Sequence, residues 1–113
     1  MIEVRRRRFL KLAGFSGAGG LLGSEANAAS RTHVVTITGF VFQPAYLEVR
    51  QGDSVSWVNK DIAPHTATGD GMEWDTGEIK FGDTVTLEVN QWSDTSYHCV
   101  YHPAMKAIIK VIG

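Results

Sequence analysis

From residue 33 onward, apolar and polar residues alternate, and this alternation limits the folds open to the chain more than any other feature. Val35 and Ile37 alternate with threonines, and the same pattern recurs at 47–50 and 84–89. Successive side chains of a strand point to opposite faces, so these segments are typical of half-buried antiparallel strands. Turn-forming residues separate them: Gln43-Pro44, Gln51-Gly52-Asp53, Gly69-Asp70-Gly71 and Phe81-Gly82-Asp83. We predict an all-β fold, an antiparallel Greek-key β-sandwich, with no amphipathic helix after residue 31.

Two segments of seven residues, 50–56 and 80–86, resemble each other, because each places Gly-Asp before an alternating stretch. Nothing beyond these positions repeats. We therefore interpret them as two similar entries into hairpins and not as an internal repeat.

Near its end the chain carries a thiol, an imidazole and a thioether within seven residues, in Cys99, His102 and Met105. This soft set favours copper over magnesium or calcium. Three donors do not complete a site, and the best candidate for the fourth is His65, in the turn Pro64-His65-Thr66. Two histidines and a cysteine in a trigonal arrangement, with a weak axial methionine, make a blue-copper electron-transfer centre. We predict that His65, Cys99, His102 and Met105 bind one copper ion that cycles between Cu(I) and Cu(II).

Other interpretations explain fewer of these residues. Alone, Cys99 or Met105 would be an ordinary core residue. A cysteine hydrolase would pair Cys99 with a histidine, but Met105 would have no role and no glycine-rich oxyanion turn follows the cysteine. Zinc takes thiolate, imidazole and carboxylate rather than thioether. A copper oxidase or nitrite reductase needs a second copper centre, and the chain lacks the histidines for one. We therefore expect that the protein is not an enzyme.

The spacing Cys99-x-x-His102-x-x-Met105 resembles the ligand loop of the cupredoxins, and in particular of the amicyanin type. Plastocyanins and pseudoazurins look similar but have a longer gap between histidine and methionine. The resemblance includes Trp57-Val58-Asn59, Tyr97-His98-Cys99 and the apolar strand after Met105, and it covers roughly residues 33 to 113. It implies a cupredoxin-like sandwich and an electron shuttle, with the ring edge of His102 as the electron exit.

Three positions beside the expected ligands differ from the family pattern. In the family, the residue after the first histidine is often Asn, the residue after the cysteine is often Thr or Ser, and the next one is often Pro. In this chain these positions hold Thr66, Val100 and Tyr101. Val100 has no side-chain hydrogen-bonding group, so it cannot supply the polar link usually drawn between the two ligand loops. Tyr101 has the backbone N–H that proline lacks. Our hypothesis is that this N–H donates a second hydrogen bond to the Cys99 thiolate and raises the reduction potential.

The remaining histidines are not expected to bind metal. Positions 97 and 99 share one face of a strand, so an inward Tyr97 places Cys99 inward and His98 outward. His33 has no motif around it, and we expect it to be a surface residue.

The first 28 residues are typical of a cleaved export signal. Arg6-Arg7 followed by Phe9-Leu10-Lys11 resembles the twin-arginine motif, and residues 12–23 are too few to span a bilayer. Ala26-Asn27-Ala28 supplies an A-x-A cleavage site, which a basic tail on a cytoplasmic protein would not require. We predict a signal at 1–28, a cupredoxin domain at 29–113 and a periplasmic location. In that oxidising compartment, metal ligation would protect the single cysteine.

Removal of this segment makes the chain acidic. Five of the eleven basic residues and two of the twelve acidic residues lie in 1–28, which leaves six against ten and a net charge of −4. Such a chain has no electrostatic attraction to nucleic acid or to an anionic membrane. We expect no membrane span and a monomer of one domain.

The expected partners are redox proteins, such as a dehydrogenase, a cytochrome or a reductase, that dock near His102. Pro103, Ala104 and Met72 would give this histidine a small apolar surround suited to brief encounters. An acidic group would steer a basic partner or would be only a solvated loop: Asp70, Glu73, Asp75 and Glu78. The alternative function is a copper carrier or store that uses the same ligands for metal delivery or tolerance.

Overall fold

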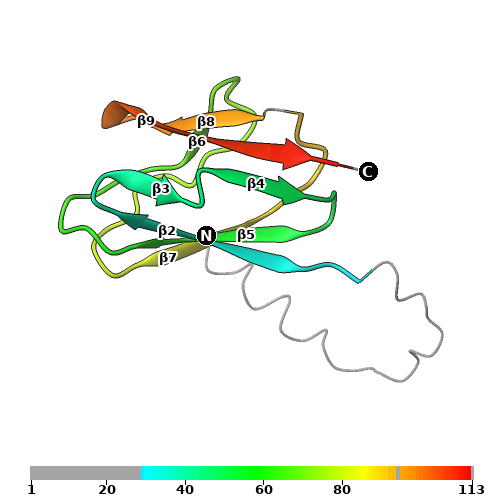
Figure 1. Ribbon diagram of the computed structural model, residues 1–113, viewed down its shortest axis with the longest axis horizontal. Helices are drawn as coiled ribbons and strands as arrows, with labels where there is room; N and C mark the ends of the chain where they lie inside the picture. The colour runs from blue at the N-terminus through cyan, green and yellow to red at the C-terminus, as the bar shows by residue number, and fades with distance from the viewer. Residues whose placement is uncertain (1–28, 94, 113) are drawn as a thin grey trace. The chain divides into compact units, whose positions relative to one another are not determined.

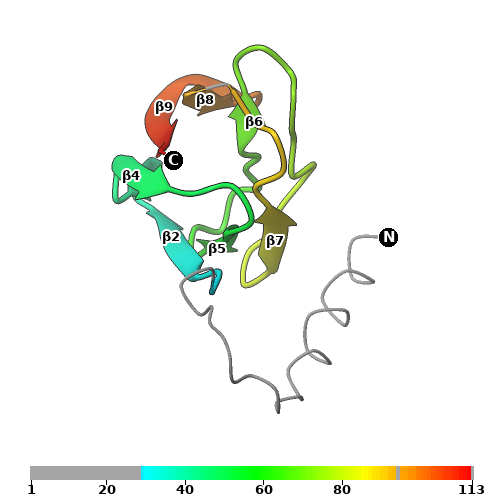
Figure 2. The ribbon, with the colours of Figure 1, turned by 90° about the vertical axis from the view of Figure 1, so that its right-hand side faces the viewer.

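In the part of the chain that the structure describes, eight strands form two sheets of four strands each, and Figures 1 and 2 show the two layers. This computed structural model describes residues 29–93 and 95–112, so the expected signal at 1–28 lies outside the described residues. The strands are β2 (Thr32–Thr38), β3 (Val41–Gln43), β4 (Tyr46–Val49), β5 (Ser54–Asn59), β6 (Thr68–Gly69), β7 (Thr84–Glu88), β8 (Ser96–Cys99) and β9 (His102–Val111). Their order is β3-β2-β5-β7 in one sheet and β4-β9-β8-β6 in the other. No helix among these residues is long and apolar enough to cross a membrane.

The predicted sandwich is confirmed, but its sheets are mixed and not purely antiparallel. β2 pairs with β5 in parallel, and β4 pairs with β9 in parallel. The other pairs, including the β8–β9 hairpin that follows Cys99, are antiparallel. Alternation predicts which side chains face the core but carries no information on the direction of the neighbouring strand. The parallel pairs therefore could not be read from the pattern.

The core between the sheets is centred on aromatic rings. Trp57 on β5 and Tyr97 on β8 are almost fully buried, and the Trp57 indole N–H donates to the Tyr97 hydroxyl at 3.3 Å. Trp74 stacks on Trp57 and on Trp92, with ring centroids 5.4 and 4.4 Å apart. Because β5 and β8 belong to opposite sheets, this cluster joins the two layers. Burial of each large ring contributes roughly 1.5–3 kcal/mol relative to exposure.

The similar segments at 50–56 and 80–86 are indeed two entries into strands. Gly52 and Gly82 have φ of 94° and 85°, a backbone region that suits glycine. The Gly52 N–H donates to the carbonyl of Val89, and the Gly82 N–H donates to the carbonyl of Asn59, each at 2.8 Å. The strands that follow, β5 and β7, pair with each other in antiparallel fashion. β5 ends at Asn59, and the loop that carries His65 follows it.

Candidate metal centre

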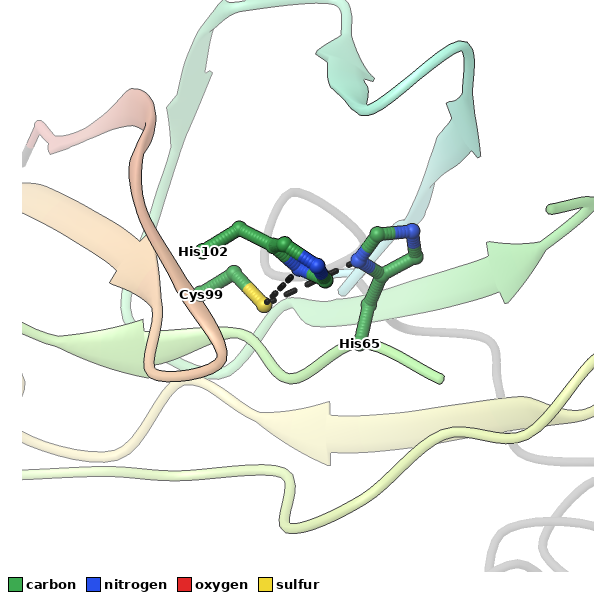
Figure 3. A group of neighbouring side chains, drawn as sticks. All are labelled: His65, Cys99 and His102. Atoms are coloured by element: carbon green, nitrogen blue, oxygen red, sulfur yellow. Dashed lines mark hydrogen bonds between the residues drawn. The ribbon is translucent and has the colours of Figure 1, made fainter. Parts of the chain in front are cut away.

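Three of the four predicted ligands meet at one end of the sandwich. The possible ligand atoms of His65, Cys99 and His102 all lie within 4.8 Å of one another. Cys99 Sγ is 3.7 Å from Nδ1 of His65 and 3.7 Å from Nδ1 of His102. Figure 3 shows both imidazole rings with a nitrogen turned toward the sulfur. His65 and Cys99 are completely buried, whereas His102 is partly exposed.

The distances among these donors suit a first-row metal ion. Bonds of about 2.3 Å to sulfur and about 2.0 Å to nitrogen, as zinc makes in proteins, place the two atoms about 3.7 Å apart when they meet at about 120°. Both sulfur–nitrogen separations in this structure have that value. A trigonal set of two histidines and one cysteine is the arrangement of blue-copper sites. The residues present therefore fit copper without movement of these donors.

Met105 lies on β9, three residues after His102, and only 6% of it is exposed. It begins a run of alternate buried residues that continues with Ala107 and Ile109. Its thioether therefore belongs to the core side of the strand that also carries His102.

The loop that carries His65 is held by the buried side chain of Asn59. Asn59 Nδ2 donates to the carbonyls of Ala63 and Ile79, each at 2.9 Å. Its Oδ1 accepts the N–H of Asp61 at 2.8 Å. His65 in turn exchanges two backbone hydrogen bonds with Ile79. The Asn59 side chain thus closes the loop whose end presents His65.

Asp61 orients the ring of His65, a role that the sequence reasoning missed. Its Oδ2 lies 2.9 Å from His65 Nε2. Burial raises the pKa of Asp61, but the N–H groups of Phe40 and Gly39 and the imidazole outweigh it, so the net pKa lies below its ordinary value. An ionised carboxylate only accepts, so His65 donates from Nε2 and leaves the Nδ1 lone pair facing Cys99. A carboxylate four residues before the histidine was the available signal.

Thr66 links the two ligand loops in a way that the sequence reasoning did not foresee. Its N–H donates to Cys99 Sγ at 3.3 Å, and its Oγ1 accepts the backbone N–H of Val100 at 2.9 Å. A polar link therefore exists although the Val100 side chain is apolar.

The hypothesis about Tyr101 is not supported. Among the described residues, no hydrogen bond joins the Tyr101 N–H to the sulfur, and the backbone amide that reaches Sγ is that of Thr66. The Tyr101 hydroxyl instead donates to Glu78 Oε1 at 3.3 Å.

The other two histidines lie outside this group. His98 is partly exposed, with Nδ1 2.6 Å from Asp70 Oδ1, which agrees with the outward orientation predicted for it. His33 was expected to be a surface residue, and it is partly exposed. Its Nε2 lies 2.9 Å from Oδ2 of the buried Asp53, so it is part of a polar cluster.

The exposed rim beside His102 is largely apolar. Val100, Tyr101, Pro103 and Ala104 are all exposed around the half-buried imidazole. Phe40, which was not anticipated, places its ring centroid 4.8 Å from that of His102. Met72 lies in the turn after β6, and no described interaction joins it to His102.

The four acidic residues of 70–78 are exposed, but they are more than a solvated loop. Each accepts hydrogen bonds from neighbouring groups: Asp70 from Ser96, Glu73 from Ser93, Asp75 from Thr68 and Gly77, and Glu78 from Tyr101. Their positions are therefore set by the fold.

The chain is similar to known proteins in both sequence and structure. Residues 29–112 match the family described as copper binding proteins, plastocyanin/azurin family. Chloroplastic plastocyanin of Tetradesmus obliquus is 27% identical over 117 aligned positions, which cover 94% of this chain and 81% of that protein. Amicyanin-alpha of Methylorubrum extorquens is 28% identical over 109 positions, which cover 88% of this chain and 92% of that protein.

Solved structures agree with the sequence matches. The Cu(I) form of a methionine-to-alanine mutant of amicyanin superimposes with a TM-score of 0.66 at 25% identity, over 80% of this chain and 90% of that chain. A reduced amicyanin mutant with phenylalanine in place of proline gives 0.63 at 26% identity, over 72% of this chain and 82% of that chain.

Proposed function

Because this chain belongs to the plastocyanin/azurin family of copper-binding proteins, the cupredoxins, we propose that it is a blue-copper protein that carries single electrons between larger redox proteins. Copper is its cofactor and supplies a one-electron couple between Cu(I) and Cu(II). The observation that carries the proposal is the convergence of His65, Cys99 and His102. His65, Cys99 and His102 would hold the copper ion, and Met105, whose soft thioether suits copper, would be its fourth and weaker donor.

The way the protein holds these donors suits electron transfer. Any rearrangement of ligands between the two oxidation states adds to the barrier, so a site that keeps one geometry is favoured. Here the ring of His65 is bonded to Asp61 and its backbone to Ile79, and Cys99 Sγ accepts the N–H of Thr66. The sandwich thus builds the donor set from two loops with hydrogen bonds that do not involve metal.

His102 is the proposed electron port. It is partly exposed, whereas His65 and Cys99 are completely buried and Met105 nearly so. Its exposed surround is apolar, which suits the small and brief contact of a redox encounter. A dehydrogenase, a cytochrome or a reductase with a basic rim would be drawn by the acidic residues of 70–78.

The mature protein is proposed to begin at Ala29 and to work in the periplasm. The family match starts at residue 29, which supports the boundary between a signal at 1–28 and a domain at 29–113. The arginine-rich start and the A-x-A site support export.

A visible spectrum of the protein loaded with Cu(II) tests the function. We expect an intense absorption band in the red that Cys99→Ser abolishes, because the thiolate is lost. His98→Ala should keep the band, since His98 lies outside the donor group. A colourless wild-type protein would rule the proposal out.

Voltammetry of the blue protein then distinguishes the carrier of electrons from the carrier of copper. Fast and reversible exchange with slow loss of copper to a chelator supports an electron carrier. Rapid release of copper with sluggish exchange would favour metal delivery or storage.

A further inference from the structure

Phe40 adopts a backbone conformation that its side chain disfavours. It has φ of 60° and follows Gly39 with φ of 63°, so the two residues form a tight left-handed turn between β2 and β3. Such turns prefer glycine, asparagine or aspartate, and a bulky residue there is a rare outlier. Phe40 is also 47% exposed, so burial in the core does not explain its conformation. Backbone outliers of this kind are concentrated at functional sites.

Asp61 holds this turn and the first histidine with one carboxylate. Its Oδ1 accepts the N–H of Gly39 at 2.8 Å, and its Oδ2 accepts the N–H of Phe40 at 2.9 Å. The same Oδ2 lies 2.9 Å from Nε2 of His65. The backbone of Phe40 and the ring of His65 are therefore oriented by a single oxygen atom.

The phenyl ring contacts both histidines of the donor group edge-on. Its centroid lies 5.0 Å from that of His65, at an interplanar angle of 89°, and 4.8 Å from that of His102, at 84°. These separations and angles are those of favourable aromatic pairs. The two imidazoles are themselves 5.1 Å apart, so one ring spans both.

We propose that Phe40 is a positioning residue, held by Asp61 as a cap across His65 and His102 that keeps both imidazoles facing the sulfur and slows the loss of copper. The inference rests on the proposed function, because it concerns the same donors. His102 is the partly exposed member of the set, so its ring has the most freedom to turn away. The cap restricts that movement from the solvent side, while Thr66 holds the sulfur from within.

Proton NMR of the metal-free protein tests the cap without copper. Phe40→Leu should shift the ring-proton signals of His65 and His102, because the edge contacts disappear. Phe81→Leu is the matched control, since Phe81 is 61% exposed and makes no described ring contact. Asp61→Asn should broaden or shift the His65 Nε2–H signal and the amide signals of residues 39 and 40. Unchanged histidine signals in Phe40→Leu would overturn the proposal.

Copper release is the second test. We expect Phe40→Leu to lose Cu(I) to a chelator about tenfold faster than wild type, since two edge contacts are removed. Phe40→Tyr keeps an aromatic ring, so it should lose Cu(I) as slowly as wild type. Phe81→Leu should also match wild type. Phe40→Gly separates the ring from the turn, because glycine suits the positive φ. It should keep or raise the thermal stability of the metal-free protein and still release copper fast.

The outcomes also separate the two proposals. If wild type binds no copper, the proposed function fails, and the metal-free NMR comparison alone decides on the cap. If wild type is blue but Phe40→Leu and Phe40→Gly release copper as slowly as Phe81→Leu, the cap is wrong and the function stands.

Discussion

Thr66 and Val100 connect the two ligand-bearing loops through a hydrogen bond from the Val100 backbone N–H to Thr66 Oγ1, at 2.9 Å. Thr66 follows His65 and Val100 follows Cys99, so the bond joins the immediate neighbours of two donors. The Thr66 N–H also reaches Cys99 Sγ. Thr66 therefore contacts both the backbone directly after β8, at Val100, and the sulfur of Cys99.

We predict that Thr66→Val destabilises the metal-free protein by about 1–3 kcal/mol, because the partly buried Val100 N–H loses its acceptor. Thr66→Ser keeps the oxygen and should cost much less. Urea unfolding of the two variants measures the difference. Equal stabilities would mean that the link contributes nothing.

Removal of the proposed axial thioether should raise the reduction potential and keep the colour. Met105→Leu conserves volume in a buried position, so we expect a stability loss below about 1.5 kcal/mol. The axial ligand tunes the potential of such sites, and loss of a donor favours Cu(I). Voltammetry checks the shift, and Met72→Leu, at an exposed methionine, should leave it unchanged. An unchanged potential in Met105→Leu would remove Met105 from the ligand set.

Tyr97→Phe should lower the free energy of unfolding by about 1–3 kcal/mol, because the buried indole N–H of Trp57 loses its acceptor. Tyr46→Phe is the control. Its hydroxyl donates to Glu48 at the exposed surface, and its loss should cost within about 0.5 kcal/mol. Thermal or urea unfolding of both variants provides the measurement.

Asp53 should make the protein sensitive to acid. Burial raises its pKa, but His33 and the backbone N–H groups of Arg50 and Arg31 outweigh this and hold the pKa below the ordinary value of 3.8. The ionised carboxylate therefore stabilises the fold fully above pH 3.8, and this contribution is lost as the pH falls through the lower folded-state pKa.

Asp53→Asn should be less stable at neutral pH by about 1–3 kcal/mol and should show a flatter loss of stability below pH 3.8. Asp83→Asn is a matched control, because Asp83 occupies the equivalent place in the second hairpin entry but is exposed. Urea unfolding across pH 2 to 7 compares them. If the free energy of unfolding falls as steeply with acid in Asp53→Asn as in wild type, Asp53 is not the source of the acid sensitivity.

The alternation of residues was enough to predict the sandwich and the inward direction of Tyr97 and Cys99, since it records which side chains are hidden from water. The spacing in Cys99-x-x-His102 predicted two of the three groups that converge, because a short turn keeps them together. The parallel pairing of β2 with β5 and of β4 with β9 was not predicted, because strand direction depends on segments that are distant in sequence.

Hydrogen bonds around the donors also escaped prediction. The Val100 N–H is a main-chain group, so its side chain gave no signal that it would reach Thr66. Asp61 and Phe40 come from different loops, and only the closed fold brings them together. His33 finds Asp53 for the same reason, across the parallel pairing of β2 and β5.

β9 is one continuous strand of ten residues, with His102 at its start and Val111 at its end. Ile108 is paired on both sides, with Tyr46 of β4 and Ser96 of β8, and the strand continues to Val111 along β4 alone, where Val111 lies opposite Val49. A pull on the carboxyl end would have to peel away these rungs before any force reached the imidazole of His102. His102 therefore lies at the end of β9 that is farthest from any opening of the strand at Val111.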